Sequence, residues 1–309
     1  MGFDEMDVSE IWMDGEFVDW DDAQVHVLTH GLHYGSGIFE GVRCYDTEKG
    51  PAIFRWEDHL DRLYDSAKPY ELDIGFEPEE LTEATTELIR REGLQSGYIR
   101  PLVFYGYESL GVSPGDCPTK TAIAVWPWGA YLGEDALENG IKVKVSSWRK
   151  HASSQIPTTA KTTGAYVNSM LATEEAGRHG YREAIVLNKE GKVAEGPGEN
   201  LFLVRGDDIY TPGLAESNLD GITRRTVIEL ARDLGYTVHD EATVSRSELY
   251  TADELFFSGT AAEVTPIRSV DDNEIGEGTK GPVTDEIQTK FFDILEEAPP
   301  EYDDWFTFV

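Results

Sequence analysis

The chain has 309 residues, of which 59 are Asp or Glu and 26 are Lys or Arg, so its formal net charge at pH 7 is −33. Such a charge repels phosphate backbones and anionic headgroups, which argues against a protein that binds nucleic acid or a membrane surface. A hydrophobic fraction of 40% is typical of a globular protein with room for two domains, and no apolar run reaches the length of a membrane span. Because the acidic N-terminus is unlike a signal peptide, we expect a cytoplasmic protein.

The acidic residues are spread along the whole chain rather than collected in one tail. Because like charges repel one another in the compact state, we infer adaptation to molar salt, as in a halophile, where the Debye length is about 3 Å. A calcium-loading protein, the alternative, would need repeated Asp/Asn loops, and the sequence has none.

The salt hypothesis predicts that the free energy of unfolding rises as salt is raised from about 0.1 M to about 1 M and beyond, since the Debye length shortens over that range. Denaturation curves recorded at several salt concentrations measure this free energy. A value that does not increase with salt would contradict the hypothesis.

The first 126 residues predict a small α+β region. Apolar periodicity and turn residues predict, in this part of the chain, a hairpin at 11–18 with Asp-Gly at its turn, an extended stretch at 25–30, helices at 54–67 and 78–92, strands at 98–105 and 121–126, and an irregular loop at 109–116.

Three histidines and two cysteines in this region invite a metal hypothesis. His26, His30 and His33 have no carboxylate or cysteine partner at ligand spacing, so we expect packed histidines and no metal site. Cys44 and Cys117 are too few for a disulfide framework, and buried thiols in a reducing cytoplasm fit them better.

The second half of the chain predicts a larger, strand-rich domain after a linker. We expect, in order, a strand at 141–145, a loop at 157–164, a helix at 165–180, a hairpin at 183–195, a strand-rich stretch at 200–210, a helix at 219–235, and an acidic tail from Glu296.

Lys161 is the residue of greatest chemical interest. It lies among small uncharged residues in the segment PTTAKTTGAY (157–166) of an otherwise acidic chain. If this site is partly buried, the pKa of the lysine falls and its free amine becomes a Schiff-base nucleophile. A surface lysine in a threonine-rich loop is the commoner outcome for such a segment, and the residues alone leave both readings open.

Motifs downstream of Lys161 narrow the choice. The segments AEGPGENLF (194–202), LDGITR (219–224) and SGTAAE (258–263) follow it in the order seen in the fold-type IV pyridoxal-phosphate enzymes, which the chain resembles. Upstream, HGLHYG (30–35), FEGVR (39–43) and YIRPL (98–102) are similar to bacterial-type branched-chain amino-acid aminotransferases. The resemblance implies the α+β fold of that class, with a small N-terminal domain at 1–126, an interdomain linker and lid at 127–137, and a large cofactor-binding domain at 138–309.

The resemblance also implies a cofactor site for pyridoxal 5'-phosphate. Lys161 would carry the cofactor as a Schiff base and then move protons. Glu195 would face the pyridine nitrogen and Tyr166 the phenolic oxygen of the ring. A glycine turn that leads into a helix suits a phosphate, and the phosphate ligands implied are Arg62, Ile222, Thr223 and Thr260, with Leu219 as a further cofactor-binding residue. Without the resemblance, an exposed Arg62 paired with Asp58 or Asp65 would be the expected arrangement.

Substrate-binding residues follow from the same resemblance. Arg100 lies in an apolar strand, where a cation is costly unless it meets an anion, and with Tyr98 it would bind the side-chain carboxylate of glutamate or 2-oxoglutarate. The loop with Leu110 and Val112 would complete the pocket of a neighbouring subunit in a homodimer or homohexamer. The other substrate residues implied are Tyr34, Phe39, Arg43, Trp128, Tyr131, Thr260 and Ala261.

The implied activity is transfer of the amino group of L-leucine, L-isoleucine or L-valine to 2-oxoglutarate, and the reverse. A D-amino-acid aminotransferase or an aminodeoxychorismate lyase of the same fold is the alternative, although the chain lacks the Arg-x-His pair of the D-enzymes. A non-catalytic acidic protein that has kept the fold is a third reading. The chain departs from the family pattern in having Ala165 before the tyrosine and Thr162-Thr163 after the lysine.

Overall fold

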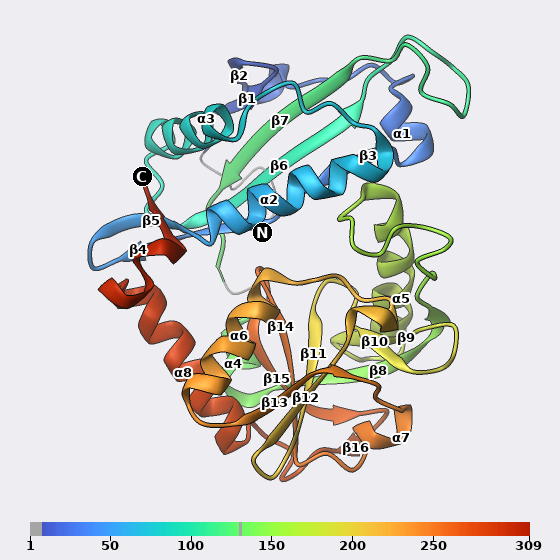
Figure 1. Ribbon diagram of the computed structural model, residues 1–309, viewed down its shortest axis with the longest axis vertical. Coiled ribbons are helices and arrows are strands. Elements are labelled where there is room, and N and C mark those ends of the chain that lie inside the picture. Colours follow the sequence, from blue (N-terminus) through green and yellow to red (C-terminus); the bar gives the residue numbers. More distant parts are fainter. Residues whose placement is uncertain (1–7, 130–131) are drawn as a thin grey trace. The chain divides into compact units, whose positions relative to one another are not determined.

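The computed structural model describes residues 8–129 and 132–309, and the chain divides into two compact units (Figure 1). The first unit comprises Met1–Gly129, Ala160–Gly164 and Ile294–Val309, and the second comprises Ala130–Thr159 and Ala165–Asp293. Lys161 and the rest of Ala160–Gly164 therefore belong to the first unit, although the sequence-based boundaries assign everything from 138 onwards to the second domain. Within the described ranges, no helix combines the length and the apolar composition needed to cross a bilayer.

An antiparallel sheet of eight strands forms the framework of the first unit. Seven strands follow one another in the order β17-β5-β4-β6-β7-β1-β2, and the eighth, β3, pairs with β6. The strands are β1 (Glu10–Met13), β2 (Glu16–Asp19), β3 (Gly37–Phe39), β4 (Val42–Thr47), β5 (Gly50–Phe54), β6 (Gly97–Tyr105), β7 (Thr119–Trp126) and β17 (Phe306–Phe308).

Helices of the first unit pack their apolar stripes on this sheet. They are α1 (His30–Tyr34), α2 (Trp56–Ala67) and α3 (Pro78–Arg91). Leu60 and Leu63 of α2 share one core cluster with Leu81 and Leu88 of α3 and with Ile99 of β6. These leucines recur at the three- and seven-residue spacing of one helix face, which is why both helices were predictable from the sequence.

The predicted hairpin at 11–18 is confirmed, whereas the extended stretch at 25–30 is wrong. Ile11 pairs with Val18 across β1 and β2, and the turn residues Asp14 and Gly15 have φ of 51° and 95°. This is the left-handed backbone that a two-residue hairpin turn requires. Residues 25–29 instead form coil and a turn, in which the Thr29 N–H donates to the His26 carbonyl, and α1 begins at His30.

The prediction of an acidic tail from Glu296 is also wrong, because the aromatic residues of this segment are buried and hold it in regular structure. Residues Pro300–Trp305 form a 3-10 helix and β17 follows. Trp305 and Phe306 are buried, β17 pairs with β5, and the ring of Trp305 meets that of Phe54 edge-on at a centroid distance of 5.8 Å. Burial of two large aromatic side chains fixes this segment in the first unit.

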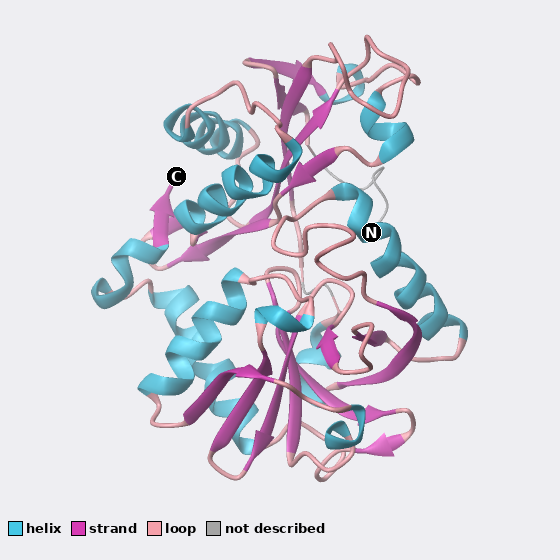
Figure 2. Ribbon diagram, turned by 45° about the vertical axis from the view of Figure 1, so that its right-hand side comes forward, coloured by secondary structure: helices cyan, strands magenta, loops and turns pink. Residues whose placement is uncertain are grey.

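A mixed sheet of nine strands forms the second unit (Figure 2). Its order is β10-β9-β8-β15-β14-β11-β12-β13, with β16 paired to β15. The β8–β9, β8–β15 and β12–β13 pairs are parallel and the others are antiparallel. The strands are β8 (Ile141–Arg149), β9 (Glu183–Leu187), β10 (Val193–Glu195), β11 (Asn200–Arg205), β12 (Asp208–Pro212), β13 (Thr237–Ala242), β14 (Glu254–Gly259), β15 (Glu263–Val270) and β16 (Asn273–Glu274).

Helices connect and cover the strands of this second sheet. They are α4 (Glu134–Asn139), α5 (Tyr166–Arg178), α6 (Ile222–Asp233), α7 (Arg246–Leu249) and α8 (Pro282–Glu297). Helix α5 is the crossover between the parallel strands β8 and β9, and its Ala172 and Ala176 pack on Ala184 and Val186 of β9. The predicted hairpin at 183–195 is confirmed by the β9–β10 pair, and the strand-rich stretch predicted at 200–210 contains β11 and β12, which pair antiparallel.

Candidate active site

Backbone contacts hold Lys161 between a strand and a helix of the first unit. The Phe39 N–H at the end of β3 donates to the Lys161 carbonyl at 3.0 Å, and the Lys161 N–H donates to the Ser66 hydroxyl of α2 at 3.0 Å. Its neighbour Thr162 forms an isolated β-bridge with Ile38. The Lys161 side chain is half-buried, and Nζ lies 4.8 Å from the centre of the Phe39 ring.

Two glycines and a threonine permit this close packing. Gly35 has φ of 62°, and a Cβ there would lie 2.7 Å from the Cα of Gly164. The Thr163 hydroxyl donates to the carbonyls of Gly35 at 2.9 Å and Gly37 at 3.2 Å. Thr163 is one of the departures from the family pattern, and here its hydroxyl anchors the lysine segment to the loop after α1.

Burial, followed by the positive charge of Arg62, lowers the pKa of Lys161 to about 8. Glu40 and Tyr98 act in the opposite direction, and Arg100 adds to the lowering. A lysine with this pKa holds an appreciable fraction of neutral amine near neutral pH, which is the nucleophilic form. The surface-lysine reading is wrong for this residue, since Lys161 is neither exposed nor ordinary in its pKa.

A buried ion pair and a histidine lie in the same unit as Lys161. Arg62 donates through Nε to Oε1 of Glu40 at 2.7 Å and through Nη2 to Oε2 at 2.8 Å, while His59 Nδ1 donates to Oε2 at 2.7 Å. Although burial alone would raise it, the pKa of Glu40 is held well below its usual range by Arg62 and His59. Burial lowers the pKa of His59, so the imidazole is neutral. The exposed Arg62 expected without the resemblance is wrong.

Arg100 on β6 is held by aromatic faces. Its guanidinium carbon lies 5.0 Å from the ring centre of Phe39, 5.3 Å from that of Tyr98 and 5.8 Å from that of Trp126. Within the described residues its Nε is buried without a hydrogen-bond partner. A cation in this setting is ready for an anionic ligand. Sequence reasoning missed Trp126, although the β6–β7 register places it opposite Tyr98.

Tyr98 and Arg43 organise the wall around Arg100. Tyr98 is buried against Trp126 and Trp128, and its hydroxyl oxygen would be 1.9 Å from a Cβ at Gly41, so position 41 has no room for a side chain. Arg43 Nη2 donates to the carbonyl of Trp128 at 3.3 Å and to that of Gly129 at 2.6 Å.

Arg43 thus fixes Trp128 and Gly129, which belong to the described start of the predicted linker and lid at 127–137. The predicted lid residue Tyr131 lies outside the described residues.

Tyr34, Leu110 and Val112 are exposed on the first unit. The Tyr34 hydroxyl donates to the Leu110 carbonyl at 3.4 Å, and His30 Nε2 contacts the Val112 carbonyl at 3.1 Å. The loop is therefore attached to α1 through its backbone, while the side chains of Leu110 and Val112 are 70% and 79% exposed. His30 is packed as expected, with Nδ1 2.6 Å from the Ser36 hydroxyl, whereas the same expectation is wrong for His26 and His33, which are exposed.

In the second unit, Glu195 ends β10 as a buried carboxylate with fixed orientation. One of its oxygens pairs with Nζ of Lys150. The other accepts from the Leu219 N–H at 2.9 Å and from Asn200 Nδ2 at 3.3 Å, and Asn200 also donates to the Leu219 carbonyl at 2.9 Å. No pattern in the sequence indicated Lys150, whereas Asn200 lies within the AEGPGENLF motif.

The start of α6 offers a site for an anion. Its first residues are Ile222 and Thr223, both buried, and its N-cap Gly221 provides no side-chain hydrogen bond. The first N–H groups of a helix have no intrahelical acceptor and form the positive end of its dipole. A Cβ on Gly221 would lie 2.0 Å from Oδ1 of Asn200, so only glycine fits there.

The remaining predicted site residues of the second unit lie at the start of a helix and in a turn between two strands. Tyr166 is the first residue of α5, and Thr260 and Ala261 form the turn between β14 and β15, all three half-buried. The first unit holds an amine and an arginine, and the second holds a carboxylate and a helix N-terminus; these are the kinds of group that pyridoxal phosphate would require. The residues present fit that cofactor.

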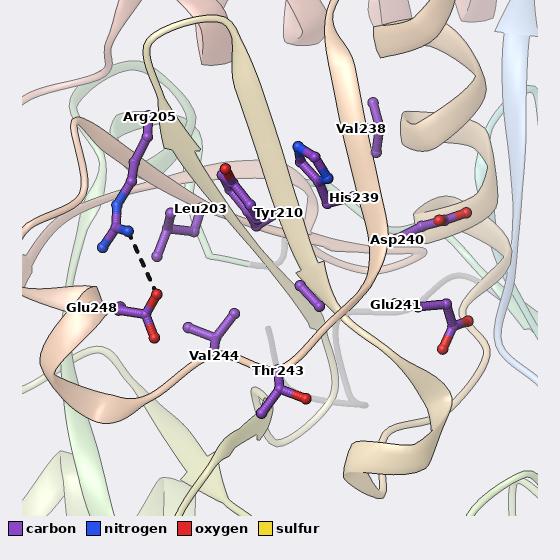
Figure 3. A pocket seen from close by; sticks show the side chains of 11 residues that line it. Leu203, Arg205, Tyr210, Val238, His239, Asp240, Glu241, Thr243, Val244 and Glu248 are labelled. Atoms are coloured by element: carbon purple, nitrogen blue, oxygen red, sulfur yellow. Dashed lines mark hydrogen bonds and ion pairs between the residues drawn. The ribbon is translucent and has the colours of Figure 1, made fainter.

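A separate pocket of about 520 Å³ in the second unit holds none of the predicted site residues (Figure 3). Arg205 on its wall is bonded to Glu248 at 3.5 Å, and His239 is paired with Asp208 at 2.7 Å. Because none of the predicted site residues lines this pocket, it is not the candidate site. Its wall comes from β11, β12, β13 and α7 and includes Leu203, Tyr210, Thr243 and Val244.

Comparison with known proteins supports the resemblance to aminotransferases that the sequence motifs indicated. The family model described as amino-transferase class IV matches residues 37–270. The branched-chain-amino-acid aminotransferase of Escherichia coli (strain K12) is 51% identical over 286 residues, which are 92% of each chain. A crystal structure of the Escherichia coli branched-chain amino acid aminotransferase superposes with a TM-score of 0.94 at 49% identity, covering 97% of this chain and 98% of that one. The branched-chain aminotransferase from the thermophilic archaeon Thermoproteus uzoniensis, in a crystal structure with norvaline, gives 0.91 at 41% identity, with 97% and 98% covered.

Proposed function

We infer that this chain, which belongs to the class IV amino-transferase family, transfers the amino group of L-leucine, L-isoleucine or L-valine to 2-oxoglutarate, and the reverse, with pyridoxal 5'-phosphate. One observation in the first unit supports this function most directly. Lys161 Nζ and the Arg100 guanidinium lie 4.8 Å and 5.0 Å from the centre of the same Phe39 ring. The amine nucleophile and an arginine that can bind an anion therefore both contact the ring of Phe39.

Lys161 performs two tasks in this proposal. Pyridoxal phosphate, when bound, supplies an aldehyde carbon for the amino group and a ring that takes up the electron pair of the substrate α-carbon. Lys161 would bind the aldehyde carbon through its neutral amine, with release of water. When free, its amine would move a proton between the α-carbon of the substrate and the cofactor's C4′ atom. Its lowered pKa, about 8, suits both directions of this proton transfer.

Other residues would hold and tune the cofactor. Glu195 would accept a hydrogen bond from the pyridine nitrogen and keep it protonated, and Tyr166 would donate to the phenolic oxygen. The phosphate ligands proposed are the Arg62 guanidinium, the Ile222 N–H and the hydroxyls of Thr223 and Thr260, with Leu219 beside Glu195.

The proposed substrate contacts separate apolar from charged recognition. Tyr34, Phe39, Tyr98 and Trp128 would surround a branched side chain, and Arg100 would bind the distal carboxylate of glutamate or 2-oxoglutarate. The N–H groups of Thr260 and Ala261 would bind the α-carboxylate. Arg43 would act through the segment that it fixes, and Tyr131 remains a proposal from the resemblance alone.

Visible spectroscopy in high salt tests this function. The purified protein with added pyridoxal phosphate should show the band of the lysine-bound cofactor, and L-leucine should convert it to the band of the pyridoxamine form. D-alanine, added to a second sample, should leave it unchanged. Conversion by D-alanine alone would indicate the D-enzyme of the same fold, and a colourless protein would indicate that the fold has lost its chemistry.

We also propose that the protein is a homodimer or homohexamer in the cytoplasm of an organism with high internal salt. Val27, Leu32, Leu110 and Val112 expose large apolar side chains on the first unit although the chain carries a charge of −33. Exposed apolar residues on so acidic a chain favour burial by a second copy. Sedimentation of the native protein beside Val112→Asp measures the assembly, and a monomeric native protein would contradict it.

A further inference from the structure

We propose that Glu40 is a positioning residue for cofactor binding, because it holds the guanidinium of Arg62 in the orientation in which Arg62 binds the phosphate. The inference rests on the proposed function, in which Arg62 is a phosphate ligand. The Glu40 side chain would touch neither cofactor nor substrate and would act through Arg62.

The contacts around Glu40 are those of a built support. Two parallel hydrogen bonds, Nε to Oε1 at 2.7 Å and Nη2 to Oε2 at 2.8 Å, join Arg62 to the carboxylate in a fork that fixes the plane of the guanidinium. His59 adds a third bond to Oε2 at 2.7 Å. The exposed fractions of Glu40, His59 and Arg62 are 1%, 2% and 8%, so solvent does not loosen this arrangement.

The backbone on either side of the pair is equally well held. Glu40 lies between β3 and β4, and its N–H donates to the Pro101 carbonyl of β6 at 2.9 Å. His59 and Arg62 are three positions apart on α2, which places both on the helix face that meets Glu40. The carboxylate thus joins the sheet to the helix that carries Arg62.

Two opposite effects of Glu40 on phosphate binding can be distinguished by their sign. As a negative charge, Glu40 repels the phosphate, and its removal would strengthen binding. As a support, it pre-orders a long flexible side chain, and its removal would weaken binding. The two-bond fork in a buried site favours the second effect, because an Arg62 that has lost the fork to Glu40 can turn toward other acceptors.

A comparison of pyridoxal phosphate with pyridoxal isolates the contribution of the phosphate. The dissociation constants of both aldehydes are measured by titration of the cofactor-free protein, native and with Glu40→Gln, from the absorbance of the lysine-bound form. The preference for the phosphorylated aldehyde, expressed as the ratio of the two constants, should fall about tenfold in Glu40→Gln, the loss of one well-placed charged hydrogen bond. Asp61→Asn, an exposed acid beside Arg62 on α2, is the matched control and should leave the ratio unchanged.

The outcomes separate this inference from the function on which it rests. Equal dissociation constants of the native protein for both aldehydes would contradict the proposed phosphate site itself. A native protein with a strong preference that Glu40→Gln retains or increases would overturn the role of Glu40 alone. If Glu40→Gln does not fold, Glu40→Asp keeps the charge but shortens the reach, and the ratio should fall about threefold; an unchanged ratio in a folded Glu40→Asp would also overturn the inference. Combining Glu40→Gln with Arg62→Met should cost nothing beyond Arg62→Met, since Glu40 acts through Arg62.

Discussion

Replacing Lys161 with alanine is expected to reduce amino transfer by about 10³-fold or more, because it removes both the covalent attachment point and the base for the α-carbon proton. The visible band of the lysine-bound cofactor should disappear in the same variant. Stopped-flow rates with L-leucine measure the first effect and absorbance the second. Lys189→Ala, which changes an exposed lysine, is the control and should retain both properties. An unchanged rate in Lys161→Ala would remove the lysine from the mechanism.

The lowered pKa of Lys161 gives this prediction a pH dependence. Only the neutral amine attacks an aldehyde, so the reaction of the cofactor-free protein with pyridoxal should accelerate as the pH rises through about 8. Between about 8 and the ordinary value of 10.5, the unfolded chain binds more protons at this position than the folded one, so the contribution of Lys161 to the free energy of unfolding increases with pH in that window. At pH values below this window, the partly desolvated cation of Lys161 disfavours the folded state, so Lys161→Met should make the cofactor-free protein more stable at pH 7.

Local features of the site could be predicted from the sequence, because short-range chemistry determines them. The isolation of Lys161 among small residues indicated a site without carboxylate neighbours along the chain. The glycine before α6 indicated a helix start without a side-chain cap, which the structure has. Burial of the Arg100 side chain was expected to cost free energy unless it meets an anion, and its buried Nε has no hydrogen-bond partner within the described residues.

Pairings between distant residues could not be predicted, since nothing in a single sequence connects their partners. Glu40 and Arg62 are 22 positions apart on different elements, and Lys150 and Glu195 are 45 apart. In a chain with 59 acidic residues, composition does not single out Glu40 and Glu195 as residues buried against cations. The assignment of Lys161 to the first unit depends on the bridge from Thr162 to Ile38, which only the three-dimensional arrangement reveals.

Replacing Arg100 with methionine is expected to slow the half-reaction with L-glutamate much more than the half-reaction with L-leucine. Charge-assisted hydrogen bonds from this guanidinium to a distal carboxylate would stabilise bound glutamate by about 3 kcal/mol, so kcat/KM for L-glutamate should fall about 100-fold. L-Leucine has no carboxylate on its side chain, and methionine keeps much of the apolar contact with Phe39, Tyr98 and Trp126, so its rate should change by less than about threefold. Single-turnover rates with each amino acid measure the two effects separately, and Arg90→Met, which changes an exposed arginine of α3, is the control.

Equal losses with both amino acids would mean that Arg100 holds the surrounding aromatic rings in place and does not bind the substrate carboxylate. A selective loss would show why the chain keeps an arginine among three aromatic rings: one apolar pocket can then accept both leucine and glutamate, which an aminotransferase must bind in turn.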